Sequence, residues 1–315
     1  MMDKRTNPLI SIVTPTYNRV GYIEDTVLSV LSQSYKHIEY IVMDGGSADN
    51  TVGVLEEYRK RDVRLTYASE KDDGMYDAIN KGFARATGDI LAYINSDDLY
   101  APGVFEAVVA YFEKHPDVDV VYGDTLVANC ETGEAHVNLY MPRPEIWLRA
   151  GGIIAQPTVF MRRRCWESAG GFRREVKYLG DCEYWLRLVD RGYRFGKINE
   201  VIAIELNHGD TLRSTMANEI ENEKRLLRQR YWPDMPLREV ARSGVILSRK
   251  MLTPLLYIYL ILKINWRTES GAWGKFIGNY KPKASLKGYL MNKLLRTNLD
   301  VWVVDVIKGV SEGKL

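Results

Sequence analysis

Residues 90–98 read ILAYINSDD, and the architecture follows most directly from this stretch. Its five apolar residues predict a buried strand that ends in two adjacent carboxylates, Asp97 and Asp98. Negative charge concentrated at the rim of a sheet must face a cation or carry a large desolvation cost. Mg²⁺ and Mn²⁺ prefer carboxylate oxygen and share their shell with substrate phosphates, so the stretch predicts a metal and diphosphate site. The alternative is a solvated Ser-Asp-Asp turn that caps a helix near Pro102.

Three further apolar segments precede this strand, and helical patterns separate them. The four expected strands are 9–13, 38–43, 64–68 and 90–94. Alternating strands and helices imply parallel pairing, so residues 1–125 are expected to form an open α/β sheet. Polar clusters follow every one of these strands, at 14–18, 44–46, 70–74 and 95–98. Because ligands of such sheets bind beyond the carboxyl ends of the strands, this half is expected to bind the main substrate.

The pattern beyond residue 125 is less regular, and we interpret 126–215 as the acceptor side of the same domain. Strands are expected at 118–122, 158–161 and 201–206. Its clearest feature is the segment LGDCE at 179–183, which places Asp181 and Glu183 at the start of a helix. Acids in a first helical turn are favoured by the helix dipole, so capping and catalysis both remain open for Asp181 from spacing alone.

Several classes of site are disfavoured by what the sequence lacks. The three cysteines show neither CxxC nor Cys/His spacing, which disfavours a disulfide framework or a zinc site. No GxGxxG follows the first strand, and no GxxxxGK[ST] occurs, so phosphate binding is expected to depend on a metal. The first residues run into a strand without an apolar signal segment, which favours a cytoplasmic location.

Residues 216–315 are expected to form a helical extension that is basic and aromatic. Between 236 and 297 there are 12 Lys and Arg residues against 2 acids, although the net charge of the whole chain is only +2. The apolar run 251–262 is shorter than the roughly 20 residues that span a bilayer. Flanked by basic residues, it is typical of a helix lying on an anionic membrane surface rather than of a nucleic-acid-binding segment. A buried core helix or a dimer element, and hence a homo-oligomer, is the alternative.

With these features placed, the chain resembles a family 2 glycosyltransferase of the GT-A fold, from residue 9 to about 214. Five motifs in order carry the resemblance: LISIVTPTYNR, SVLSQSYKHIEYIVMDGGSADNT, SEKDDGMYDAINKGFARATGDILAYINSDD, VYGD and GDCEYWLRL. The fold it implies is a Rossmann-like, open, mostly parallel sheet flanked by helices. The activity it implies is transfer of a hexosyl or N-acetylhexosaminyl group from a nucleotide-sugar donor.

The resemblance also implies which residues contact the donor and the metal. Asp98 is the better metal ligand and Asp97 the better ribose or sugar contact, while His208 could complete the metal shell and Arg213 could hold the diphosphate. The cofactor would be Mn²⁺ or Mg²⁺. The remaining donor-binding residues, in the loops that contact the base and ribose, would be Thr14, Pro15, Tyr17, Asp44, Lys71 and Asp73.

On the acceptor side, Asp181 matches the general base, and Glu183 is close enough to be confused with it. Removing a proton from an attacking hydroxyl and neutralising a leaving diphosphate require two acidic sites. A base opposite the leaving group implies a single displacement with inversion. A UDP-sugar donor and a lipid-linked or polysaccharide acceptor at the inner face of the cell membrane are expected from the family. A catalytically silent subunit that binds a sugar nucleotide or scaffolds a glycan-assembly complex is the alternative.

Overall fold

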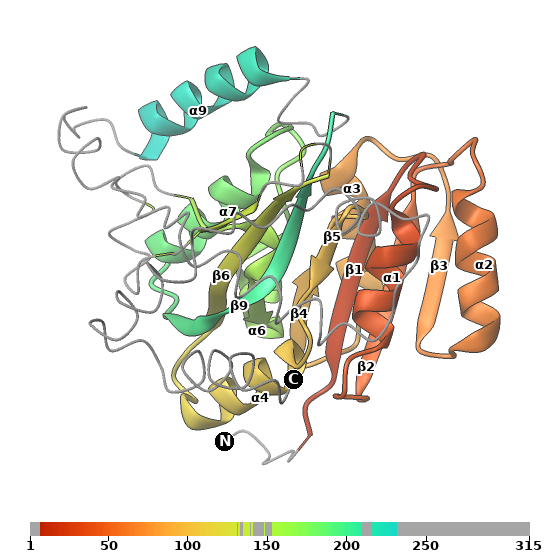
Figure 1. Cartoon of the computed structure of the whole chain (residues 1–315). Coiled ribbons are helices and arrows are strands. Elements are labelled where there is room, and N and C mark those ends of the chain that lie inside the picture. Colours follow the sequence, from red (N-terminus) through yellow and green to blue (C-terminus); the bar gives the residue numbers. More distant parts are fainter. Residues whose placement is uncertain are drawn as a thin grey trace, which may run out of the picture.

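A mixed β-sheet of nine strands forms the centre of the computed structural model (Figure 1). The structure describes residues 7–130, 132, 135–138, 140, 148, 153–209 and 216–231. Within these residues the strand order is β3-β2-β1-β4-β8-β6-β9-β5, and β7 pairs with β6. The strands are β1 (Ile10–Thr16), β2 (Ile38–Asp44), β3 (Leu65–Ser69), β4 (Ile90–Tyr93), β5 (Asp98–Tyr100), β6 (Val120–Asn129), β7 (Ala135–Asn138), β8 (Phe160–Arg162) and β9 (Phe195–Asn207).

The first four strands form the parallel half of the sheet, as the sequence predicts. β1 pairs in parallel with β2 and β4, and β2 pairs in parallel with β3. All seven residues of β1 are buried, as expected of a strand in a sheet that is covered on both faces. Parallel pairing brings the carboxyl ends of these strands to one edge of the sheet.

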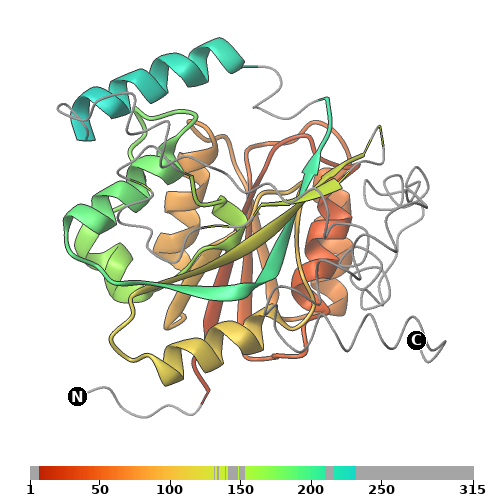
Figure 2. The ribbon, with the colours of Figure 1, turned by 60° about the vertical axis from the view of Figure 1, so that its left-hand side comes forward.

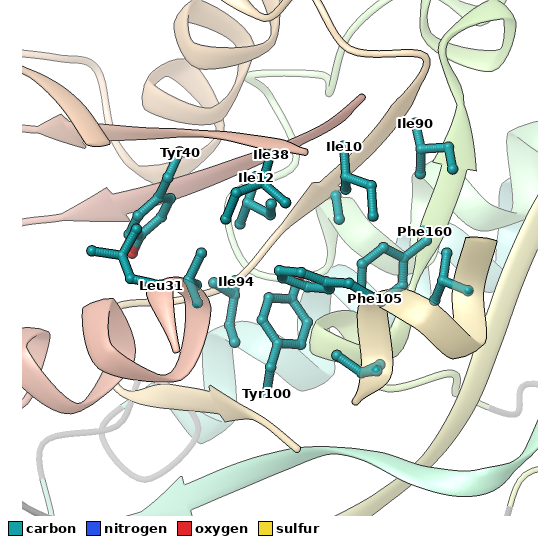
Figure 3. Close-up of a cluster of buried hydrophobic side chains, with 14 of the residues drawn as sticks. Ile10, Ile12, Leu31, Ile38, Tyr40, Ile90, Ile94, Tyr100, Phe105 and Phe160 are labelled. Carbon is teal, nitrogen blue, oxygen red and sulfur yellow. The ribbon is translucent and has the colours of Figure 1, made fainter. Parts of the chain in front are cut away.

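Helices cover both faces of the sheet, and side chains of β1 alternate between the two cores. Ile10 and Ile12 pack with α1 (Ile23–Leu31), α2 (Thr51–Arg61) and α4 (Val104–Lys114), in the cluster that Figure 3 shows. Val13 packs on the opposite face with α3 (Met75–Arg85), α6 (Arg163–Ala169) and α7 (Gly180–Asp190). Figure 2 shows these helices on either side of the strands. The result is a three-layer α/β arrangement.

The second half of the sheet is mixed, with antiparallel pairs beside the parallel strands. β8 is antiparallel to both β4 and β6, and β5 is antiparallel to β9. β6 and β9 are parallel to each other and longer than expected, with register shifts near Asp124. β5 was not predicted, because three residues are too few to show a period. The predicted boundary at residue 125 falls inside β6, so both halves share one sheet.

The last described element is α9 (Ala217–Tyr231), which lies over the side of the molecule that contains α7 (Figure 1). The basic segment 236–297 and its apolar run 251–262 lie outside the described residues. In the part of the chain that the structure does describe, no helix is long and apolar enough to cross a membrane.

Candidate active site

The carboxyl-terminal edge of the parallel strands is organised around Asp44, the last residue of β2. Its side chain is 1% exposed. Its Oδ2 accepts hydrogen bonds from the Gly46 and Ser47 amides, at 3.1 and 3.0 Å, and from the Ser69 hydroxyl at the end of β3, at 2.6 Å. The Gly45 amide in turn donates to the carbonyl of Thr16 at 2.9 Å. Asp44 therefore holds the ends of three neighbouring strands together.

The predicted nucleoside-contacting loop at the end of β1 has one exposed member. Thr14 and Pro15 are buried, and the hydroxyl of Thr14 accepts a hydrogen bond from Tyr40 at 3.0 Å. Tyr17 is 59% exposed and lies beyond the strand end, where an aromatic ring can cover a base. The side chain of Thr16, 5% exposed, has a hydroxyl oxygen without a hydrogen-bond partner. The backbone of this loop and the ring of Tyr17 thus form the accessible surface of the predicted contact.

Lys71 and Asp73 lie in the exposed connection between β3 and α3. A β-carbon on Gly46 would lie 3.8 Å from the Lys71 amide, so this connection runs alongside the turn that Asp44 organises. The Asp73 carboxylate lies 3.5 Å from the guanidinium of Arg174, which also contacts Asp77 at 2.5 Å. The exposed connection is therefore tied to the segment that precedes α7.

Asp98, the first residue of β5, lies at the end of β4 as predicted but is almost completely enclosed. It is 7% exposed, its Oδ2 accepts a 3.3 Å hydrogen bond from the Asn95 amide, and its carbonyl accepts one from Thr26 at 2.9 Å. The antiparallel register of β5 and β9 places Asp98 directly opposite Glu205. Two carboxylates at directly opposed positions repel each other.

The electrostatics of Asp98 follow from this packing. Burial raises the pKa of its carboxyl well above the ordinary value of 3.8, and the neighbouring charges of Asp97 and Glu205 raise it further. The hydrogen bond from Asn95 acts in the opposite direction. A cation bound here would offset the repulsion and favour the ionised form, and carboxylate oxygen is a ligand type that divalent cations prefer.

His208 lies beside Asp97. Its Nε2 is 3.2 Å from the Asp97 Oδ2, its ring stacks on Tyr22 with centroids 4.2 Å apart, and it is 6% exposed. The guanidinium of Arg19 lies 4.0 Å from the same carboxylate oxygen. No group of three His, Cys, Asp or Glu side chains among the described residues is arranged to hold a metal ion. Arg213, the predicted diphosphate contact, lies outside the described residues.

The two acids at the start of α7 have different environments. Glu183 has no exposed surface, and its carboxylate contacts the guanidinium groups of Arg173 and Arg187, each at 3.0 Å. It also accepts a 2.5 Å hydrogen bond from the hydroxyl of Tyr231. Asp181 is only partly buried, and its backbone amide donates to the Tyr76 hydroxyl at 3.2 Å. Glu183 is thus held in a buried network, whereas Asp181 reaches the surface.

Tyr93, the last residue of β4, is buried and responds to charges at both acidic sites. Burial raises the pKa of its hydroxyl well above the ordinary value, and Tyr76, Asp181 and Asp98 are among the groups whose charges raise it further. Within the described part of the chain its hydroxyl has no hydrogen-bond partner, and its carbonyl accepts from the side-chain amide of Gln156 at 2.5 Å. The charges of Asp98 and Asp181, which lie on two elements, thus both raise the pKa of Tyr93.

Comparison with known proteins defines the family of this chain. The sequence profile described as "Glycosyl transferase family 2" matches residues 11–175, which is more than half of the chain. The chain belongs to glycosyltransferase family 2. This family 2 glycosyltransferase is 32% identical over 202 residues to the teichuronic acid biosynthesis glycosyltransferase TuaG of Bacillus subtilis, covering 62% of this chain and 78% of TuaG. It is 30% identical to the glycosyltransferase EpsE of the same organism, with coverage of 62% and 72%.

Solved structures confirm the GT-A architecture of this family 2 glycosyltransferase. Residues 1–349 of S. aureus TarS in complex with UDP-GlcNAc align with a TM-score of 0.58 at 18% identity, covering 96% of this chain and 92% of that one. The mannosyltransferase PcManGT of Pyrobaculum calidifontis, in complex with GDP-Man and Mn²⁺, aligns with a TM-score of 0.53 at 18% identity, covering 96% and 87%. At these identities the likeness concerns the fold.

Three residues of the site were missed by sequence reasoning. Glu205 lies opposite Asp98, and the signal for it was a single acid inside an otherwise apolar strand segment. Arg19 and Tyr22 follow the first strand and reach Asp97 and His208. Arg19 ends the motif LISIVTPTYNR, and Tyr22 follows it by three residues. The available signals were the charge of Arg19 and the aromatic ring of Tyr22 next to a polar loop.

Proposed function

We propose that this glycosyltransferase transfers a sugar from a nucleotide-sugar donor to a hydroxyl of a glycan or lipid-linked acceptor, with inversion and with the help of Mn²⁺ or Mg²⁺. The observation that carries the proposal is the pair of acidic sites on one sheet edge. Asp97 and Asp98 follow β4, Asp181 lies in the first turn of α7, and the charges of Asp98 and Asp181 both raise the pKa of Tyr93. The transferred sugar would lie between the two sites.

The donor would bind on the Asp98 side of this edge. Asp98, together with Asp97 and His208, would hold the divalent cation. When bound, the cation supplies positive charge that offsets the charge developing on the departing diphosphate. Asp97 would also contact the ribose or the sugar, and the nucleoside would lie on the loops that carry Tyr17 and Lys71. TarS has been solved with UDP-GlcNAc, which supports a UDP-sugar as donor.

Asp181 would accept the proton of the attacking hydroxyl. Its partial exposure leaves it accessible, whereas Glu183 is occupied by Arg173, Arg187 and Tyr231. A carboxylate that faces the acceptor, opposite a departing diphosphate, favours a single displacement at the anomeric carbon. The product would have the opposite anomeric configuration to the donor.

The acceptor and the location are inferred from two separate observations. TuaG is named for teichuronic acid biosynthesis, which supports a cell-envelope polysaccharide or its lipid-linked precursor as acceptor. The excess of Lys and Arg between 236 and 297 favours an anionic membrane, at its cytoplasmic face. Flotation of the full chain with neutral and with anionic liposomes tests the location. Equal behaviour with both would contradict it.

The central experiment compares three variants with a panel of UDP-, GDP- and dTDP-sugars in the presence of Mn²⁺. Asp98→Asn is expected to lose cation-dependent nucleotide binding, and Asp181→Asn to retain that binding but lose transfer. Asp190→Asn, at the exposed far end of α7, is the matched control and is expected to behave as the wild type. Nucleotide binding without transfer or donor hydrolysis by the wild-type protein would instead support a silent binding subunit.

A further inference from the structure

One carboxylate on α9 holds the loop that leads into the helix of Asp181. Glu223 accepts hydrogen bonds from three consecutive backbone amides: Lys177 at 2.7 Å, Tyr178 at 2.8 Å and Leu179 at 2.6 Å. Leu179 is the residue immediately before α7, and Asp181 lies two residues further on. Glu223 thus reaches this loop from an element more than forty residues later in the chain.

The sequence around the start of α7 offers no local substitute for this contact. The N-cap residue is Leu179, which has no side-chain hydrogen bond to the helix. Helices usually begin with Ser, Thr, Asp or Asn, whose side chains fix the entry of the chain into the first turn. Hydrogen bonds from neutral amides to an ionised carboxylate are also stronger than those to a neutral acceptor. The entry into α7 is therefore fixed by α9.

A second contact from α9 reaches the same turn of α7. The hydroxyl of Tyr231, at the end of α9, donates a hydrogen bond to the buried carboxylate of Glu183 at 2.5 Å. On the other side, the hydroxyl of Tyr76 on α3 accepts a hydrogen bond from the backbone amide of Asp181 at 3.2 Å. Asp181 is thus held between α3 and α9, and both views of the chain show α9 lying over α7 (Figures 1 and 2).

We propose that Glu223 is a positioning residue for Asp181, so that α9 is part of the catalytic apparatus although it lies beyond the family match at 11–175. The inference rests on the proposed role of Asp181 as the base. A base must lie within hydrogen-bond reach of the proton it removes, and displacement of a catalytic group by about 1 Å can lower a rate by roughly a hundredfold. Loss of the three amide contacts would allow such displacement, whereas Asp97 and Asp98 lie on other elements.

The test compares single and double mutants, and it measures the rate of transfer and the binding of the donor separately. Glu223→Ala is expected to lower kcat for transfer at least about tenfold. The KM for the nucleotide sugar and its Mn²⁺ dependence are expected to change by less than a factor of about two, because the donor residues lie on other elements. Glu223→Gln, which keeps one acceptor oxygen, should recover part of the rate. Glu221→Gln, on the exposed side of α9, is the matched control and should behave as the wild type.

The same substitution in an Asp181→Asn background separates positioning from a general structural effect. A residue that acts through Asp181 should lower the residual rate of Asp181→Asn less than about twofold, because the group it positions is already lost. An equal loss of kcat in both backgrounds, a wild-type rate for Glu223→Ala, or a parallel loss of donor binding would overturn the proposal. If Asp181→Asn itself transfers at the wild-type rate, the proposed base is wrong, and that result is independent of the Glu223 comparison.

Hydrogen exchange gives a direct structural readout. In Glu223→Ala the amides of 177–179 should exchange faster, while those of β1 and β4 should keep their wild-type protection. Glu223→Gln should fall between these two. Unchanged exchange at 177–179 in both variants would show that the three contacts do not hold the loop in solution.

Discussion

Replacing Asp98 by asparagine is expected to stabilise the metal-free protein while it abolishes cation-dependent donor binding. The pKa of Asp98 is raised in the folded protein, first by burial and then by Asp97 and Glu205. The folded state therefore holds a proton over the interval between the ordinary value of 3.8 and the raised value, and stability falls as pH rises through that interval. At neutral pH without a cation, the carboxyl of Asp98 is therefore a cost to the folded state that asparagine removes.

The magnitude follows from the pairing of β5 with β9. Directly opposed residues of an antiparallel pair have β-carbons about 5 Å apart, and two unit charges at that distance repel by about 3 kcal/mol at an effective dielectric constant of about 20. Because Glu205 is partly exposed, we halve this to about 1.5 kcal/mol. For a folded region of this size, that difference raises Tm by about 3–6 °C.

Thermal unfolding in EDTA at pH 7.5 and at pH 4 is the assay. Asp98→Asn should melt above the wild type at pH 7.5, and the difference should shrink at pH 4, where Asp98 holds its proton. Saturating Mn²⁺ and UDP at about 100 times Kd should stabilise the wild type by about 2.7 kcal/mol and leave the variant unchanged. Asp190→Asn, at the exposed far end of α7, is the control and should not be stabilised. A lower Tm for Asp98→Asn in EDTA, or a difference independent of pH, would refute the reasoning.

Three further changes probe the core and the cysteines. Glu183→Ala should lower the free energy of unfolding by about 3–5 kcal/mol in urea titrations, because it leaves the buried guanidinium of Arg187 without its carboxylate partner; a loss below about 1 kcal/mol would contradict this. Gly82→Ala should cost about 1–3 kcal/mol, since its β-carbon would meet a methyl of Val13 at 2.4 Å, and an unchanged urea midpoint would show that the contact relaxes freely. Burial raises the pKa of Cys165 to about 12, so a thiol reagent at pH 8 should label it only after denaturation, and rapid labelling of the native protein would count against the packing described.

The parallel half of the fold could be predicted closely because its strands are buried on both faces. The expected strands at 9–13, 38–43, 64–68 and 90–94 each begin within one residue of β1, β2, β3 and β4. β5 could not be predicted, because its pairing with β9 depends on a register between residues more than a hundred positions apart. The full lengths of β6 and β9 were also missed, since register shifts interrupt any simple period.

The candidate site shows the same division between local and distant information. Asp97 and Asp98 were recognised from the strand they end, which is a local pattern. The distinction between Asp181 and Glu183 was left open, because both lie in the first turn of the same helix. It depends on Arg173 and Tyr231, which approach Glu183 from other elements. Burial among distant partners, rather than residue type, separates an accessible acid from a structural one.

The pairing of β5 with β9 also has a consequence for how the protein is made. Asp97 and its partner His208 are 111 residues apart in the chain. At about 5–20 residues per second, a ribosome needs roughly 6–20 s to synthesise the intervening segment. During that time the parallel strands can assemble around their apolar residues, but the acidic edge has neither its cross-strand neighbour nor its histidine. Under the proposed function, donor binding would therefore require that the late strand has docked, and a chain truncated before β9 should not gain the nucleotide site.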